Sequence, residues 1–450
     1  MPSPFPPSLP LPPVLQMARW LRAPFPMLDE CHARFGDYFT LRLPRLPRVV
    51  LVADPLAVKD VFGLGPDQGH AGKANFVLKP VVGQHSLLLL DGAEHMRQRK
   101  MMMPAFHGER MNAYGQTMLD MTHDEIDRLP VGARFSAMRP MQNITLQVIL
   151  RTVFGVEEGP RLAELATVLR TMLDATSNPI LILTFLQRDL GPLTPWGRFV
   201  RHAARASELL RAEIRRGRAQ GTAGRADVLA MLLDARDEEG RPLSEDEVHD
   251  ELVTLLAAGH ETTATSLAWT LRWLLPDRDL LGRLREEIAT ACGDPQKIAR
   301  LELLDATVKE SLRLQPVIPM VGRVLQEPAR IGTLDLDAGG VVAPSIYLVH
   351  RRPALYPDPE RFRPERFLGW KPSPWEFLPF GGGLRRCIGA TFAIYEMKMV
   401  LAALLPRVEM RLDAKRVPTV RRGVTIMPGG GLPVVVTARR SRGSAAPRAA

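Results

Sequence analysis

The chain has 450 residues, of which 46% are hydrophobic and 24% are charged, a composition typical of a globular protein with a sizeable core. A formal net charge of +10 is compatible with nucleic-acid binding, but the basic residues are dispersed and no nucleic-acid-binding motif occurs, which argues against that function. Three cysteines, Cys31, Cys292 and Cys387, are too few and too scattered for a disulfide framework, so we expect a reducing compartment.

The N-terminal residues are rich in proline, from Pro2 to Pro13, and lack the charged-then-apolar pattern of a signal peptide. No run of about 20 apolar residues occurs anywhere, so no membrane-spanning segment is predicted and we expect a cytoplasmic protein. Apolar and alternating runs at Tyr38–Leu43 and Arg48–Ala53 predict the two strands of a hairpin. Asp54 and Pro55 then provide an N-cap and a first-turn proline for a short helix that ends near Phe62.

The middle of the chain is predominantly helical in pattern. Residues 63–87 look irregular, whereas helix-period patterns dominate from Asp91 through Leu314. Ser244 and Glu247 form a capping box for a helix of about 30 residues that runs to Leu275, where Pro276 stops it. An unusually polar island, residues 259–263, interrupts the apolar residues of this long helix and predicts a local distortion.

The last quarter of the chain is rich in proline and in strand patterns. Closing strands are predicted at Val408–Leu412, Val424–Met427 and Leu432–Ala438. The basic residues from Arg439 onward, followed by small residues, predict a disordered tail over 439–450. The predicted fold class is therefore mainly α with a small β region.

The most informative segment runs from Phe380 to Gly389 and places Cys387 among glycines and arginines, just ahead of an apolar helical pattern. A thiolate at a helix start is favoured by the helix dipole and by unpaired N–H groups, and both lower its pKa. Glycines permit a tight turn and a close approach to a flat ligand. These properties suit a cysteine that ligates haem iron, whereas Cys387 alone would more simply be a buried structural cysteine.

With Phe380, Gly381, Gly383, Arg385 and Gly389 in register, the segment resembles the haem-binding loop of the cytochrome P450 superfamily, Phe-Gly-x-Gly-x-Arg-x-Cys-x-Gly. Three more motifs of that family follow its order and spacing, namely Ala258-Gly259-His260-Glu261-Thr262-Thr263, Glu310-Ser311-Leu312-Arg313 and Pro364-Glu365-Arg366-Phe367. The resemblance extends from about Phe35 to about Val436. Each short motif is weak alone, but four in order are specific.

The resemblance implies a soluble, bacterial-type P450 fold, a single large helical domain with minor β-sheets. Length alone would favour more than one domain; the family instead implies a proline-rich segment at 1–20, a haem domain at 21–438 and the basic tail. It also implies haem b (iron protoporphyrin IX) as cofactor and Cys387 as the metal ligand. The implied activity is a monooxygenase that inserts one atom of O2 into a hydrophobic small molecule.

The same resemblance assigns roles to residues by their motif positions. Glu261 and Thr262 match the acid–alcohol pair that delivers protons during oxygen activation, and Glu310, Arg313 and Arg366 match a buried network that supports the cysteine loop. The positions implied to contact the haem are His95, Arg99, Ala258, Arg323, Phe380, Arg385, Cys387 and Gly389.

Partners follow from the family and from the apolar character of its variable regions. A ferredoxin or flavodoxin with its NAD(P)H reductase is the expected electron donor, steered by positive charge near Arg385 and Arg386, with Arg97 and Lys100. Apolar stretches such as Ile180–Leu183 favour a lipophilic substrate, namely a fatty acid, terpenoid or steroid-like molecule. Two alternatives stay open: a peroxide-driven peroxygenase or isomerase on the same haem, and a non-catalytic haem-thiolate sensor or carrier.

Overall fold

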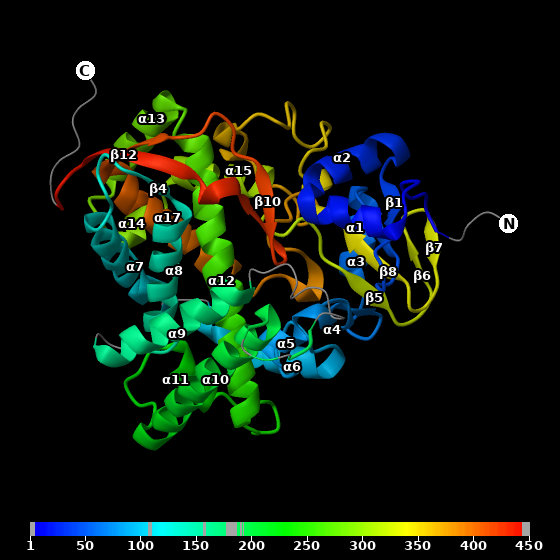
Figure 1. Cartoon of the computed structure of the whole chain (residues 1–450), viewed down its shortest axis with the longest axis horizontal. Coiled ribbons are helices and arrows are strands. Elements are labelled where there is room, and N and C mark those ends of the chain that lie inside the picture. The colour runs from blue at the N-terminus through cyan, green and yellow to red at the C-terminus, as the bar shows by residue number, and fades with distance from the viewer. Residues whose placement is uncertain are drawn as a thin grey trace.

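The computed structural model describes residues 5–106, 110–155, 159–176, 187–189, 191 and 193–442. A large helical part lies beside a smaller part built around a five-stranded sheet (Figure 1). The chain thus has the predicted class, mainly α with small sheets. The apolar stretch at Ile180–Leu183 and the last residues of the expected tail, 443–450, lie outside the described residues.

The five-stranded sheet joins segments from both ends of the chain. Its order is β1 (Tyr38–Leu41), β2 (Val49–Val52), β8 (Val341–Pro344), β5 (Arg323–Leu325) and β3 (Gly69–His70). β1 and β2 form the predicted antiparallel hairpin, and β2 then pairs in parallel with β8. β5 pairs antiparallel with β8 and with β3. This pairing anchors Arg323 at the start of a central strand.

Two separate cores cover the faces of this sheet, because successive side chains of a strand point in opposite directions. Leu51 packs against α1 (Pro13–Arg22) and α2 (Pro24–Phe35), whereas Val50 and Val52 pack against α3 (Pro55–Gly63). The small β6–β7 hairpin (Ala329–Ile331 and Leu334–Leu336) adds to the second core. Sequence patterns alone did not predict α1, which begins at Pro13 inside the proline-rich segment.

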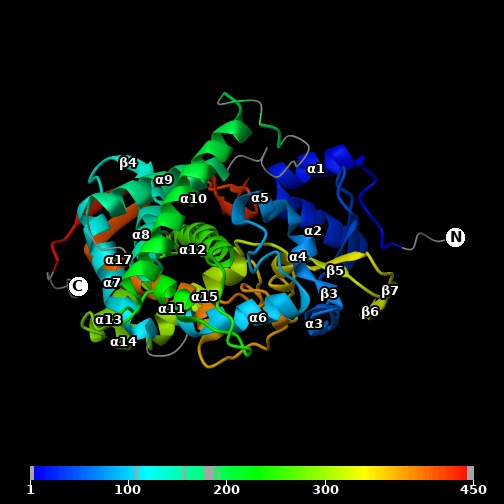
Figure 2. The same ribbon diagram turned by 90° about the horizontal axis from the view of Figure 1, so that it is seen from below.

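The predicted long helix is α12 (Glu245–Leu274), which runs through the helical part of the molecule (Figure 1 and Figure 2). Its 30 residues span about 45 Å. Both hydrogen bonds of the capping box are present, from Glu247 N–H to Ser244 Oγ and from Ser244 N–H to the Glu247 carboxylate. Among the helices that α12 contacts, the most extensive packing is with α8 (Met138–Thr152), α10 (Pro195–Gln220), α15 (Glu302–Leu314) and α17 (Ala390–Arg407).

The other helices complete the helical part and connect it to the sheet. They are α4 (Ala71–Ala74), α5 (Lys79–Val82), α6 (Gly92–Met102), α7 (Arg110–Asp127), α9 (Pro160–Thr176), α11 (Val228–Asp234), α13 (Arg278–Thr290), α14 (Pro295–Ile298) and α16 (Ile346–Val349). The prediction of dominant helix from Asp91 to Leu314 is confirmed, with β4 (Arg134–Ser136) as the strand that interrupts it.

The predicted closing strands are present; one has the predicted ends and the other two are shifted by one residue. β9 (Val408–Leu412) and β4 flank β12 (Pro433–Arg439) in a three-stranded sheet, and β10 (Thr419–Arg422) pairs with β11 (Thr425–Pro428). Trp269 of α12 donates its Nε1–H to the carbonyl of Ile426 at 3.0 Å, which fixes this β10–β11 hairpin against the long helix. Arg439, expected to open the tail, is the last residue of β12.

Candidate active site

The cysteine loop is a closed turn immediately before α17. The N–H of Cys387 donates to the carbonyl of Phe380 at 2.9 Å, and Gly389 is the N-cap residue of α17. A Cβ atom on Gly382 or Gly383 would lie only 2.4 or 2.1 Å from atoms of Phe62 in α3. These glycines are therefore required by the close approach of the loop to α3, a reason that the sequence did not reveal.

The thiol of Cys387 lies deep in the protein but remains accessible. Its side chain is exposed, yet burial raises its pKa above the ordinary value. A group with both properties faces an internal space rather than bulk solvent. The Gly389 N–H and the charges of Arg99 and Arg386 lower the pKa but do not outweigh desolvation. The expected net lowering of the thiol pKa by the helix start is thus wrong for the protein without a ligand, and a bound metal ion would be the dominant force for ionisation.

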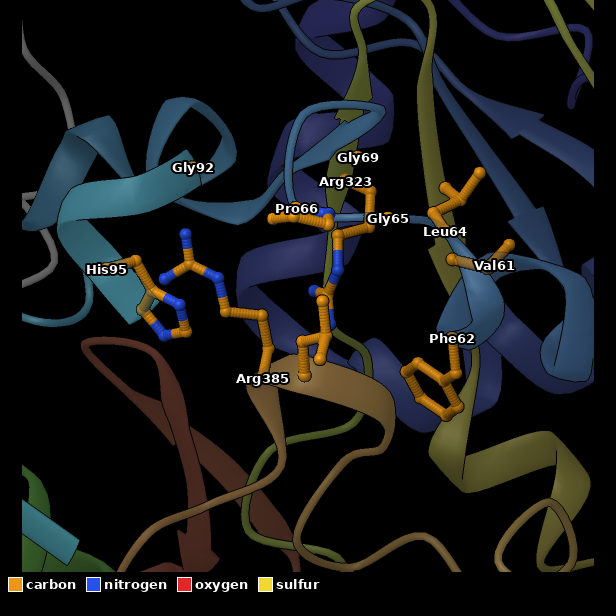
Figure 3. Close-up of a pocket in the computed structure, with 11 residues that line it drawn as sticks. Val61, Phe62, Leu64, Gly65, Pro66, Gly69, Gly92, His95, Arg323 and Arg385 are labelled. Atoms are coloured by element: carbon orange, nitrogen blue, oxygen red, sulfur yellow. The ribbon is translucent and has the colours of Figure 1, made fainter. Parts of the chain in front are cut away.

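Cationic and polar side chains converge beside the cysteine loop, around a small cavity (Figure 3). His95 of α6, Arg323 of β5 and Arg385 line this cavity. Burial and the three neighbouring arginines lower the pKa of His95 to about 3, and burial followed by Arg385 lowers that of Arg323 to about 10. Positive charges that lie close together away from solvent disfavour each other's ionised form, and a bound anion would relieve this repulsion. The cavity therefore fits an anionic group.

Arg99 and Arg385 also hold the loop itself. Arg99 donates from Nη2 to the carbonyl of Arg386 at 2.7 Å rather than lining the cavity with the other three residues. Arg385 donates from Nη1 to the carbonyl of Leu87 at 3.0 Å, and its Nη2 contacts the Leu90 carbonyl and the Asp91 carboxylate. Both arginines therefore connect the cysteine loop to the chain around α6.

The segment before α6 is tied in turn to the N-terminal half of α12. The N–H of His85 donates to Asp250 Oδ2 at 2.9 Å, and the hydroxyl of Thr254 donates to Ser86 Oγ at 2.7 Å. Leu87 directly follows Ser86, so these bonds also fix the Leu87 carbonyl, which accepts a hydrogen bond from Arg385. The long helix and the cationic cavity are thus parts of one connected structure.

The middle of α12 also faces an internal space. Ala258 is exposed although Leu256 and His260 on either side are buried, and Thr262 is partly exposed one turn later. The Thr262 hydroxyl donates to the carbonyl of Ala258, as expected for a hydroxyl that bonds to the preceding turn. Residues four apart share a helix face, so Ala258 and Thr262 present a small side chain and a hydroxyl to the same space.

Glu261 points toward a residue that the sequence motifs did not identify. Its Oε1 lies 3.1 Å from Nε of Arg422 in β10, a separation of an ion pair although the geometry is not that of a hydrogen bond. Arg422 also donates from Nη2 to Asp174 of α9 at 2.9 Å. Burial raises the pKa of Glu261 above its ordinary value, Arg422 opposes this, and Asp174 adds to it. The sequence feature that could have indicated this contact is the pair of adjacent arginines at positions 421 and 422.

The structure brings Glu310, Arg313 and Arg366 into one network, as the resemblance implies. The Glu310 carboxylate accepts from Nε and Nη2 of Arg313 at 2.7 and 2.8 Å, and from Nε of Arg366 at 3.0 Å. The Glu310 and Arg313 side chains have 0% exposure. Arg313 also donates to the carbonyls of His350 and Pro359 at 2.8 Å. Every strong acceptor and donor here has a partner, which is the condition for tolerating buried charge.

His350, which sequence analysis did not assign to the site, links this network to the cysteine loop. Burial and Arg313 keep its pKa well below the ordinary value, so the imidazole is neutral. Its Nε2 accepts from the N–H of Leu378 at 2.7 Å, which places the proton on Nδ1, where it donates to the Arg313 carbonyl at 3.1 Å. Leu378 lies two residues before Phe380. A buried histidine in a proline-rich stretch gives no sequence signal for this bridge.

The residues of this site fit a bound haem. A deep, accessible thiol, a helix face with a small residue and a hydroxyl, and a cation-lined cavity match the three needs of the cofactor: an axial ligand, space for a flat macrocycle and partners for its carboxylates. In the part of the chain that the structure describes, no helix combines the length and the apolar character needed to cross a membrane.

Comparisons with known proteins give the same result. The Cytochrome P450 family model matches residues 2–431. The Mycobacterium tuberculosis protein described as cytochrome P450 135B1 is 42% identical over 398 residues, which cover 88% of this chain and 83% of that protein. Cytochrome P450 137 of the same organism is 33% identical over 400 residues, 88% of this chain and 82% of that protein.

A solved structure shows the same fold. Retinoic acid bound cyanobacterial CYP120A1 superposes with a TM-score of 0.84 at 26% sequence identity, and the match covers 97% of this chain and 99% of that chain. The chain therefore belongs to the cytochrome P450 family.

Proposed function

We propose that this chain is a haem b monooxygenase in which Cys387 is the iron ligand and residues 21–438 form the catalytic unit. The family to which it belongs binds haem and supports monooxygenase activity in general. The single observation that supports the assignment most strongly is the Cys387 thiol, which lies deep in the protein, where burial raises its pKa, and yet remains exposed. His95, Arg323 and Arg385 would hold the propionates, while Arg99, Phe380 and Gly389 shape the cysteine loop.

When bound, the haem would supply the iron at which O2 is activated. The chain's own part is to place protons and exclude water. Thr262 has a hydroxyl proton on Oγ1 that now bonds to the Ala258 carbonyl and can turn toward the internal space. Glu261 holds a proton more readily than an ordinary glutamate because its pKa is raised, and Arg422 limits that rise. The pair Glu261 and Thr262 therefore forms a route from the protein surface near Asp174 to the face of α12.

We infer a lipophilic substrate, from the class of fatty acids, terpenoids and steroid-like molecules. A groove lined by Phe76, Lys79, Pro80, Gly83, Gln84 and Gln187 opens beside α5 and is mostly apolar along its wall. Burial of an apolar ligand there would contribute about 25 cal/mol per Å². The related cyanobacterial protein binds retinoic acid, which is a lipophilic molecule of this kind.

We further propose a separate electron donor, a ferredoxin or flavodoxin with its NAD(P)H reductase, and a cytoplasmic location. Of the basic residues expected to steer this donor, Arg97 pairs with Asp237 and Glu247, and Lys100 pairs with Glu238. Their positive charge is therefore largely compensated. The exposed Arg386 at the cysteine loop has no such acid partner among the described residues, which makes it the stronger candidate for donor contact.

Turnover with a lipophilic compound tests the proposal against its rivals. The expected result is product formation that requires O2, NAD(P)H and a donor chain together. Product formed with hydrogen peroxide alone at an equal rate would indicate a peroxygenase or isomerase. Haem binding and ligand-induced spin shifts without any turnover across a panel of fatty acids, terpenoids and steroids would indicate a sensor or carrier.

A further inference from the structure

Arg421 lies on the side of the β10–β11 hairpin that faces the N-terminal helices. In the register of this hairpin, Arg421 pairs with Ile426, whose side chain belongs to the core formed with Trp20. The Arg421 guanidinium stacks over the Trp20 ring of α1, with its carbon 5.0 Å from the ring centroid. In Figure 1 β10 accordingly lies between α12 and α1.

Among the described residues, this guanidinium has no anionic partner. Its Nε donates to the carbonyl of Gly423 at 2.9 Å, and Nη1 is buried with no hydrogen-bond partner in the same part of the chain. Neither Nη atom bonds to any described residue. Burial alone lowers the pKa of Arg421 to about 10, because no carboxylate of the described residues opposes the desolvation. An unpaired buried charge is costly, so a fold keeps one only where something else compensates it.

The positive charges of other buried arginines in this protein are compensated by carboxylates. Arg313 and Arg366 bind Glu310, and Arg407 binds Asp127. The other arginine whose pKa falls to about 10 is Arg323. Arg323 lines the cavity assigned above to the carboxylates of the cofactor. Arg421 has the same lowered pKa and, like Arg323, no ion pair among the described residues, although Asp91 acts on the pKa of Arg323 and no carboxylate acts on that of Arg421. Arg421 lies on a different element and does not line that cavity.

The hairpin that carries Arg421 contacts the proposed reaction site through its opposite face. The following residue, Arg422, lies on the opposite face of β10 and contacts Glu261 beside Thr262. On the partner strand, the N–H of Ile426 donates to the carbonyl of Val317 at 2.9 Å, in the segment that leads from α15 to Arg323. The hairpin thus belongs to the wall around the internal space that α12 faces.

We propose that Arg421 binds the carboxylate of the substrate, which makes the substrate a lipophilic monocarboxylic acid. This inference rests on the proposed function and narrows its substrate class. The free Nη1 and Nη2 edge of a guanidinium matches the two oxygens of one carboxylate. A phosphate monoester, with nearly two charges, would need a second cation, and the adjacent Arg422 is already engaged by Glu261 and Asp174.

Matched ligands and variants of the holoprotein test this assignment. Dodecanoic acid, 1-dodecanol, methyl dodecanoate and 1-dodecanesulfonate are titrated by calorimetry and by the low-to-high-spin Soret shift. The wild type should bind the acid about 10- to 100-fold more tightly than the alcohol or ester, the range of charge-assisted hydrogen bonds. Arg421→Gln should abolish this preference without weakening binding of the alcohol, and Arg421→Lys should keep part of it.

Arg272→Gln is the matched control, because Arg272 also stacks on a tryptophan, with its carbon 5.4 Å from the Trp273 ring centroid, but is less deeply buried than Arg421, so that water can satisfy its N–H groups. It should retain the full preference for the acid. Thermal unfolding without ligand separates binding from a structural role: Arg421→Gln should melt at the same or a higher temperature than the wild type, since it removes an unpaired buried charge. A clear fall in melting temperature would indicate a structural arginine and overturn the assignment.

Equal affinity of the wild type for acid and alcohol, binding of neither, or an acid preference that survives in Arg421→Gln would also overturn it. Dodecanesulfonate, a singly charged anion whose oxygens can also pair with a guanidinium, should bind more tightly than the alcohol to the wild type but not to Arg421→Gln. A sulfonate preference that survives in Arg421→Gln would overturn the assignment. The spectrum of the reduced, carbon monoxide-bound protein is recorded on the same preparations. A thiolate-type spectrum with no acid preference refutes the role of Arg421 alone, whereas a spectrum without thiolate character refutes the proposed function.

Discussion

Arg313 and Arg366 form ion pairs with the buried carboxylate of Glu310, whereas Arg323 and Arg421 are desolvated and form no ion pair among the described residues. Both regions bury guanidinium groups, but within the described part of the chain only the first pairs them with a carboxylate. We propose that the saturated network is a scaffold for the cysteine loop, which it reaches through His350. We propose that the unsaturated arginines instead bind an anion from outside the chain. A buried arginine that stabilises the fold and one that binds a ligand are therefore distinguished by whether each has a carboxylate partner, not by how deeply each is buried.

Breaking the saturated network should have the largest effect. Glu310→Ala leaves Arg313 and Arg366 buried and unpaired, which should cost about 3–5 kcal/mol of the free energy of unfolding and prevent accumulation of holoprotein. Purified yield and haem content per polypeptide measure this. Lys309→Ala on the same helix removes the half-exposed pair with Asp305, 2.6 Å apart, and should change stability by less than about 1 kcal/mol. A stable, haem-loaded Glu310→Ala protein would refute the scaffold role.

Removing the Thr262 hydroxyl from the face of α12 should leave the fold intact but impair the reaction. Thr262→Ala should retain haem and substrate binding while coupled product formation falls about 100-fold and NAD(P)H oxidation yields hydrogen peroxide instead. The ratio of product to NAD(P)H consumed, with peroxide assayed in parallel, reports the effect. Thr263→Ala, at a buried neighbouring position, is the control and should stay coupled. Tight coupling in Thr262→Ala would contradict the proposed proton route.

His350 connects the saturated network to the cysteine loop, and its loss should have an intermediate effect. His350→Phe leaves the Leu378 N–H and the Arg313 carbonyl without their partner, which should cost about 1–3 kcal/mol, and His350→Gln should recover part of this. Urea unfolding measures both variants.

The same histidine predicts a pH dependence. Its folded-state pKa is lowered, so the unfolded chain binds more protons as the pH falls below about 6.5, and stability should decline there while it stays level above. His350→Gln should show a shallower decline than the wild type. An identical slope in both proteins would show that other groups cause the acid sensitivity.

The smallest expected effect concerns the Glu261–Arg422 pair. Arg422 lowers the pKa of Glu261, so Arg422→Gln should raise it further and keep the carboxyl protonated to higher pH. The alkaline limb of the pH profile for coupled product formation should therefore move to higher pH, with about 3- to 10-fold more product than the wild type on that limb. Arg139→Gln removes another partner of Asp174, 3.6 Å away, without touching Glu261, and should leave the profile unchanged. Superimposable profiles for Arg422→Gln and the wild type would exclude this role.

Local signals predicted the elements that depend on neighbouring residues. The capping box and Pro276 gave the ends of α12 to within two residues, and alternation gave the β1–β2 hairpin. The family motifs placed Glu310, Arg313 and Arg366 together. What could not be predicted depends on contacts between distant segments: the bridge made by His350, the pairing of Arg422 with Glu261 and the isolation of Arg421. The direction of the Cys387 pKa was missed because a sequence shows the helix start but not the depth of burial.

The proposed reaction and the proposed roles of Thr262 and Arg421 all depend on ligation of the haem iron by the Cys387 thiolate. The most direct measurement is the absorbance spectrum of the purified, reduced protein under carbon monoxide. The account predicts the red-shifted Soret maximum of thiolate-ligated haem in the wild type and its loss in Cys387→Ser. A wild-type Soret maximum at the position of histidine- or neutral-thiol-ligated haem, or a red-shifted maximum that persists in Cys387→Ser, would contradict it.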